Sequence, residues 1–222
     1  MPVREHFEKD LKALQNKLVE LCKFAQRALE RSLQAFEQQN MLLAQEIIDG
    51  DHVPDLLYEE IVDDAIWVIT KQQPVASDLR KIVMTIKIAT DYERVADFAV
   101  NIAKSTIRLN RKPEPVMKKT LENLNRMYEV TNEMVINGLK AFIDEDIQLA
   151  KKVADMDDEV DQLYGETIKE LFKVNRSNPD NIDYVAQLLF ICRYLERTAD
   201  HITNVAENVV YLVKGKHFDL NE

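Results

Sequence analysis

The chain has 222 residues and a formal net charge of −10, and it contains only 4 glycines and 6 prolines. This composition disfavours strands, glycine-rich phosphate loops and low-complexity linkers, and it predicts an all-helical protein. The negative charge argues against nucleic-acid binding, and the lack of a long apolar run or a signal-peptide core predicts a cytoplasmic protein with no direct membrane insertion.

The first predicted element is a long helix that starts near Phe7. Its apolar and small positions alternate at spacings of four and three residues as far as Ala35, which is typical of a helix with coiled-coil-like packing. A helix of about forty residues would be on the order of 60 Å long. The segment Asp49-Gly50-Asp51 predicts the break at its end.

Two further helices are expected in the first half of the chain. The second helix starts between Asp51 and Pro54, because aspartate caps helices and proline is tolerated in the first turn, and Pro74 ends it. The third helix runs from about Val75 to Arg108. Three antiparallel helices are the simplest way to close such a bundle.

The second half of the chain repeats the first. The sequence ERVADFAVNIA at residues 93–103 returns as ERTADHITNVA at residues 196–206, and earlier segments match under a shift of about 106 residues. We therefore predict a tandem duplication of two antiparallel three-helix bundles, residues 1–112 and 113–222. The proline-rich segment from Arg111 to Pro115 would be the joint between them.

A glutamate occupies the apolar stripe of the third helix in both copies. Glu93 and Glu196 are each followed four residues later by an aspartate, so two carboxylates share one helix face. In an antiparallel hairpin, residues equally far from the turn lie at the same level, which places two aspartates of the second helix opposite each pair. The predicted clusters are Asp51, Asp55, Glu93 and Asp97 in the first copy, and Asp157, Asp161, Glu196 and Asp200 in the second.

These two clusters predict sites for divalent or transition metal ions, because four carboxylates at one level repel one another unless a cation neutralises them. Fe, Zn, Mn, Mg and Ni all remain open as the metal. Two simpler interpretations also remain open. Asp51 and Asp157 lie where a helix starts and would serve as caps, while Arg94 and Arg197 would form ion pairs with the aspartates three residues later.

The doubled E-R-x-A-D-x-x-x-N-x-A motif, the paired D-x-x-x-D and E-x-x-x-D segments and the six helices in two halves resemble the PhoU family, the regulators associated with bacterial phosphate-specific transport. The resemblance implies a cytoplasmic protein that is not an enzyme, usually a homodimer or higher oligomer, with metal ions at its acidic motifs. It also implies two partners, the ATPase subunit of a phosphate ABC transporter and a phosphate-sensing histidine kinase. The protein would contact them at the inner face of the membrane. Such a protein restrains phosphate uptake and holds the kinase in its repressing state when phosphate is plentiful.

The residues before the two motifs differ, Asp91-Tyr92 in the first and Tyr194-Leu195 in the second, so the two sites need not have equal metal affinity.

Two other functions remain open. A ferritin-like carboxylate metal protein would also place acids inside a helical bundle, but it requires Glu-x-x-His pairs, and the sequence contains none. A structural coiled-coil-like scaffold would explain the apolar seam but not the duplicated glutamate.

Overall fold

A computed structural model describes residues 2–109, 115–216 and 220, and all regular elements in this part of the chain are helical. The first repeat contains α1 (Pro2–Gln38), α2 (Met41–Asp49), α3 (His52–Gln72) and α4 (Ser77–Leu109). The second repeat has the same order, α5 (Lys118–Asp144), α6 (Ile147–Asp155), α7 (Asp157–Ser177) and α8 (Ile182–Lys214), with short 3₁₀ helices at Pro115–Met117 and Pro179–Asn181. The predicted all-helical fold with two similar halves is confirmed.

The long first helix of each repeat is interrupted at a place that the sequence did not lead us to expect. Gln39 has a left-handed φ of 52°, and the side chain of Asn40 accepts a hydrogen bond from the backbone N–H of Leu43, so a new helix starts there. Glu145, with φ of 51°, and the capping residue Asp146 interrupt the second repeat in the same way. The prediction of one unbroken helix of about forty residues is therefore wrong, and each repeat has three long helices plus one short helix in the connection.

The predicted end of the second helix is confirmed. The helix α3 ends at Gln72, and Gln73 adopts a left-handed φ of 48° before Pro74. The third helix starts at Ser77, two residues later than expected. Residues 110–114 of the predicted joint lie outside the described residues, so the boundary between residues 112 and 113 stays a prediction.

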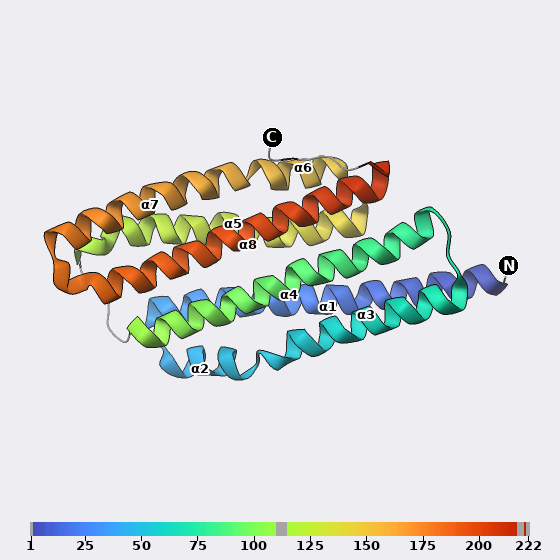
Figure 1. The fold of residues 1–222 in the computed structure, drawn as a ribbon, viewed down its shortest axis with the longest axis horizontal. Coiled ribbons are helices and arrows are strands. Elements are labelled where there is room, and N and C mark those ends of the chain that lie inside the picture. Colours follow the sequence, from blue (N-terminus) through green and yellow to red (C-terminus); the bar gives the residue numbers. More distant parts are fainter. Residues whose placement is uncertain (1, 110–114, 217–219, 221–222) are drawn as a thin grey trace.

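The long helices form two layers. The helices α3, α4, α8 and α7 lie side by side in this order and form one face of the molecule, the hairpin face, while α1 and α5 pack behind them (Figure 1). The two antiparallel helices at the centre, α4 and α8, join the repeats, and buried side chains from both repeats form one apolar cluster. Fully buried Tyr92 of α4 reaches into the second repeat and donates a 2.6 Å hydrogen bond to the carbonyl oxygen of Val135 in α5. The two bundles are therefore one packed unit.

Candidate metal centres

The first acidic cluster is assembled across the hairpin of α3 and α4. Asp55 of α3 and Glu93 and Asp97 of α4 each offer a carboxylate oxygen, and these oxygens all lie within 4.8 Å of one another. Glu93 and Asp97 are half-buried, whereas Asp55 is exposed. Three oxygens at this spacing, open to solvent on one side, can coordinate one cation. The reflection about Pro74 therefore predicted correctly which side chains of α3 and α4 meet.

Asp51, the fourth member of the first cluster, belongs to the same electrostatic group. Burial raises the pKa of Asp51, and the charges of Asp97 and Asp55 raise it further. Although Asp51 precedes α3, its side chain makes no capping hydrogen bond, and its Oδ1 is buried without a hydrogen-bond partner. The capping interpretation is therefore wrong for Asp51. A buried carboxylate oxygen without a donor is costly, and a cation would satisfy it.

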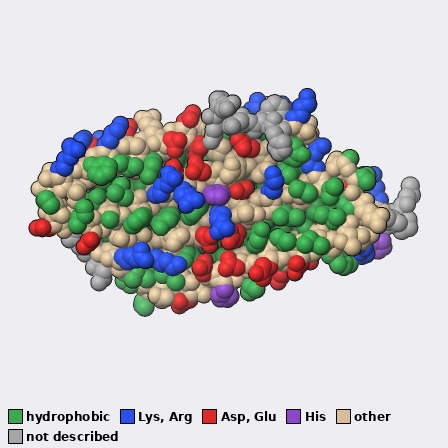
Figure 2. Space-filling model, viewed as in Figure 1, with side chains coloured by type: hydrophobic (Ala, Val, Ile, Leu, Met, Phe, Trp, Pro, Cys, Tyr) green, Lys and Arg blue, Asp and Glu red, His purple; other side chains and the backbone are tan. Residues whose placement is uncertain are grey.

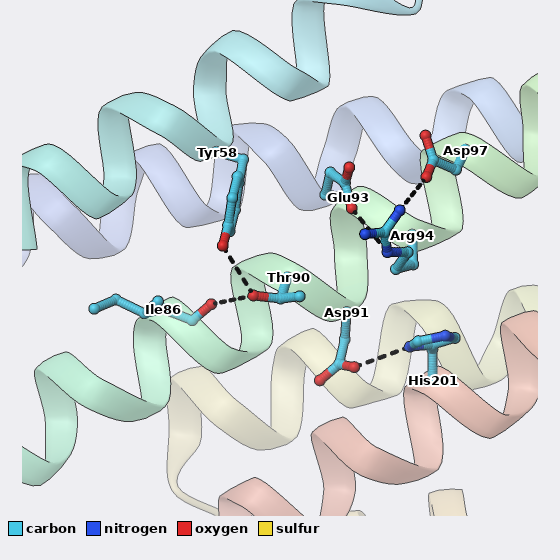
Figure 3. A network of polar contacts seen from close by, with 8 residues as sticks. All are labelled: Tyr58, Ile86, Thr90, Asp91, Glu93, Arg94, Asp97 and His201. Carbon is cyan, nitrogen blue, oxygen red and sulfur yellow. Dashed lines mark hydrogen bonds and ion pairs between the residues drawn. The ribbon is translucent and has the colours of Figure 1, made fainter.

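Arg94 gives the first cluster part of its neutralising charge. Its guanidinium lies 2.7 Å from Asp97 and 3.4 Å from Glu93, as Figure 3 shows. The predicted ion pair within the helix is therefore present. Half of the Arg94 side chain is exposed, and such a pair contributes little to stability. Burial and the charge of Asp97 still hold the pKa of Glu93 above its ordinary value, even though Arg94 lowers it.

The second cluster is centred on Glu196, which is only 8% exposed. Burial raises the pKa of Glu196 to about 7, and the carboxylates of Asp200, Asp161 and Asp157 contribute to the rise against the effect of Arg193. The four predicted acids of the second copy are therefore close enough to interact. Their oxygens are less tightly grouped, because among the described residues the three-oxygen arrangement within 4.8 Å is found in the first cluster alone.

One oxygen of Glu196 is satisfied and the other is not. Arg193 donates a 2.5 Å hydrogen bond to Oε1, while Oε2 is buried without a hydrogen-bond partner. Arg193 was not predicted from the sequence, although its spacing of three residues before Glu196 is the signal of an ion pair within a helix. The expected partner Arg197 instead lies over the ring of Phe98, 5.1 Å from its centroid. The arginine that neutralises carboxylate charge thus stands at a different position in each cluster, which is a physical reason for the two sites to differ in metal affinity.

Comparison with known proteins follows the same division of the chain. The PhoU domain matches residues 18–106 and again residues 124–209. The chain belongs to the PhoU family. A phosphate-specific transport system accessory protein PhoU homolog of Clostridium acetobutylicum is 36% identical over 220 residues, 99% of each chain. The homolog of Aquifex aeolicus is 40% identical over 217 residues, 96% of this chain and 97% of its own. The crystal structure of PhoU from Pseudomonas aeruginosa matches with a TM-score of 0.89 at 28% identity, covering 95% of this chain and 100% of that one.

Each PhoU domain contains one complete acidic cluster, and the two domains are joined by a contact near these clusters that was not predicted from the sequence. Asp91 of the first PhoU domain and His201 of the second are 3.0 Å apart, Oδ1 to Nδ1 (Figure 3). Asp91 is two residues before Glu93, and His201 follows Asp200 directly. His201 thus faces a carboxylate of the other domain and not the second cluster. The acidic clusters of this PhoU protein therefore consist of carboxylates alone. In the described part of the chain, no helix is long and apolar enough to span a membrane.

Proposed function

We propose that this protein is a regulator of phosphate-specific transport that couples the state of a phosphate ABC transporter to a phosphate-sensing histidine kinase. The similarity over nearly the whole chain to accessory proteins of the phosphate-specific transport system is the observation that carries this proposal. Since a fold alone does not specify a function, the presence of an acidic cluster in each PhoU domain is a second support. The protein acts without catalysis, as a homo-oligomer, on the cytoplasmic side of the membrane. There it contacts the ATPase subunit of the transporter and the kinase.

The proposal includes a divalent cation at each acidic cluster. Asp51, Asp55, Glu93 and Asp97 would hold one cation, and Asp157, Asp161, Glu196 and Asp200 would hold the other. The chain fits such ions because buried oxygens of Asp51 and Glu196 have no hydrogen-bond donor. Among Fe, Zn, Mn, Mg and Ni, an all-carboxylate set favours the harder ions Mg²⁺ and Mn²⁺. A bound cation would supply positive charge that offsets the repulsion among the carboxylates. It would also tie α3 to α4 in the first repeat and α7 to α8 in the second.

A ferritin-like di-iron function is a weaker candidate. Such sites combine glutamate with histidine ligands from facing helices. His201, the histidine next to the second cluster, instead lies 3.0 Å from Asp91, Nδ1 to Oδ1, and packs its ring against Phe98, with centroids 5.5 Å apart. A structural or regulatory ion therefore accounts for these carboxylates better than a redox centre.

The regulatory role can be tested in cells that carry a reporter for phosphate-starvation genes. Deleting the protein should leave the reporter expressed in phosphate-rich medium, and restoring the wild-type chain should repress it again. Normal repression after deletion, in a strain with no second homologous copy, would reject the assignment. Normal repression by a variant that binds no metal would reject the metal mechanism while leaving the regulator assignment intact.

A further inference from the structure

An open hollow of about 490 Å³ lies between the start of α5 and the C-terminal half of α7. Six charged side chains line this hollow, four basic and two acidic: Lys119, Lys169, Lys173 and Arg176, with Glu166 and Glu170. The four basic side chains are exposed. Figure 2 shows Lys and Arg side chains gathered at the upper left edge of the molecule, over the C-terminal half of α7. The hollow is therefore positive, although the chain has a net charge of −10.

The acids of the hollow engage only part of this positive charge. Glu170 accepts a 2.7 Å hydrogen bond from Lys173 and lies 3.7 Å from Lys119, so two lysines share one carboxylate. Within the part of the chain that the structure describes, neither Lys169 nor Arg176 forms an ion pair with a carboxylate. Two exposed cations of the hollow thus remain available to an anion from solution.

The basic residues of α7 form a line along the hollow. Lys169, Lys173 and Arg176 are spaced by four and then three residues, which places them on one face of the helix. Seven residues of α-helix extend on the order of 10 Å. A single phosphate ion would contact one neighbouring pair of these side chains, whereas a chain of two or three linked phosphates would extend along all three. The arrangement therefore favours an elongated polyanion over a compact ion.

The equivalent positions in the first repeat carry the opposite charge. A shift of 106 residues places Ala13, Asp63, Trp67 and Thr70 at the positions of the four basic residues. The two acids have acidic counterparts, Glu60 and Asp64, which Lys17 bridges at 2.9 and 2.8 Å. The positive charge thus belongs to the second repeat and is not required by the duplicated fold.

The charge of the whole chain favours a small soluble anion over an anionic membrane surface. Charges are largely screened beyond about 8 Å at physiological ionic strength. An ion inside the hollow therefore interacts mainly with the side chains that line it, whose net charge is positive. A membrane surface would face a larger area of a chain with net charge −10, and it would be repelled.

We propose that this hollow binds a soluble oligophosphate, an anion with two or more linked phosphate groups. Lys169 and Arg176 donate charge-assisted hydrogen bonds to its phosphate oxygens, and Lys119 and Lys173 add positive charge. The hollow lies at the opposite end of α7 from the second acidic cluster. The inference therefore rests neither on the cations at the clusters nor on the proposed function.

Calorimetric titration of the full chain with sodium tripolyphosphate tests the proposal. The protein is first freed of metal by chelation and dialysis, so that metal ions do not mediate binding. We expect one tripolyphosphate per chain, an affinity that falls as salt is raised, and binding of inorganic phosphate that is weaker by about tenfold or more.

A double variant removes the two cations that have no carboxylate partner. Lys169→Gln with Arg176→Gln should weaken tripolyphosphate binding by about tenfold or more. The matched control Lys23→Gln with Lys151→Gln has the same change in net charge at two exposed lysines outside the hollow. This control should keep the wild-type affinity within about twofold.

A second variant should gain affinity. Glu170→Gln would release Lys173 and Lys119 from their shared carboxylate, so tripolyphosphate should bind about threefold more tightly. Damage to the fold would not produce this gain, and melting curves show whether each variant is folded.

Three results would overturn the inference: no saturable binding of tripolyphosphate, equal affinities of the Lys169 and Arg176 double variant and its control, or binding of inorganic phosphate as tight as that of tripolyphosphate. Vesicles that contain phosphatidylglycerol form the last arm. If they bind the wild-type chain while tripolyphosphate does not, the basic side chains recognise a membrane surface and the inference is rejected. Each of these results leaves the proposed regulatory function standing, since that function is tested by repression in cells.

Discussion

His201 of the second repeat lies 3.0 Å from Asp91 of the first, Nδ1 to Oδ1. Tyr194 and Phe98 occupy the positions that match Asp91 and His201 in the other repeat, and their rings stack with centroids 6.1 Å apart. Duplication has thus produced one polar and one aromatic version of the same contact. Because Asp91 and His201 lie close to Glu93 and Asp200 along the chain, the polar version joins α4 to α8 beside the two acidic clusters.

Removing His201 should destabilise the protein because buried Asp91 would lose its 3.0 Å contact with the imidazole. We expect His201→Ala to lower the free energy of unfolding by about 1–3 kcal/mol, as for other polar groups left unsatisfied in a core. The cost should be smaller when Asp91 is already asparagine, which removes the charge. Urea unfolding of both single variants and the double variant measures the coupling. The control His52→Ala, at an exposed histidine, should stay within about 0.5 kcal/mol of wild type. Equal costs of His201→Ala in the two backgrounds would contradict the interaction.

Two glycines on helices provide a matched pair for testing the packing around α5. A Cβ at Gly138 of α5 would lie 3.0 Å from Ile202 Cγ2 and 3.4 Å from the hydroxyl of Tyr92, while a Cβ at Gly165 of α7 would meet nothing within 4 Å. Gly165→Ala should stabilise the protein by about 0.5–1 kcal/mol, because alanine favours helix. Gly138→Ala should gain less than Gly165→Ala or destabilise by about 1–3 kcal/mol, because crowding opposes that gain. Thermal melting distinguishes them, and equal stabilisation would show that α5 is not tightly packed against α8 and Tyr92 there.

The raised pKa of Glu196, about 7, predicts a pH dependence of stability in the metal-free protein. The folded state keeps its proton on Glu196 at pH values where the unfolded state has lost it. The stabilisation from Glu196 is therefore present below pH about 4.5 and is lost as pH rises through about 7. The loss is about 3 kcal/mol at most. Urea unfolding in chelator at several pH values should show this decline in wild type, and Glu196→Gln should lack it. Glu20→Gln, at an exposed position, is the control, and parallel pH profiles of wild type and Glu196→Gln would refute the prediction.

The site could be predicted from the sequence because it depends on local geometry. The helix period places Glu93 and Asp97 on one face, and the symmetry of an antiparallel hairpin about Pro74 places Asp55 beside them. Both relations hold in the structure. The same reasoning predicts the second cluster, where Asp161 and Asp200 influence the pKa of Glu196.

The parts that could not be predicted depend on one residue or on the packing of one repeat against the other. Residues 37–40 are polar but include no glycine or proline, so only the left-handed backbone of Gln39 reveals the break, and Asn40 is then recognisable as a cap. The symmetry of one hairpin does not predict how α4 packs against α8. The pairing of Asp91 with His201 therefore became visible only in the folded chain.

The central claim is that cations at the two acidic clusters stabilise this fold, and thermal melting in Mn²⁺ or Mg²⁺ tests it most directly. A site at a cation concentration a hundred times its Kd adds about 2.7 kcal/mol of stability. For a chain of this size each kcal/mol corresponds to roughly 2–4 °C. Wild type should therefore gain several degrees. The variant Glu93→Gln, Asp97→Asn, Glu196→Gln and Asp200→Asn should gain nothing, because it keeps the size of these side chains but loses their charge.

A control variant with amides at four exposed acids outside the clusters, Glu20, Glu30, Asp63 and Asp144, has the same change in net charge. Our account predicts that this control gains as many degrees as wild type. It also predicts that, without added metal, the cluster variant is at least as stable as wild type, since the repulsion among its carboxylates is relieved. If the cluster variant gains as much melting temperature from the cation as the wild type and the control do, the clusters are not the metal sites and the central claim is contradicted.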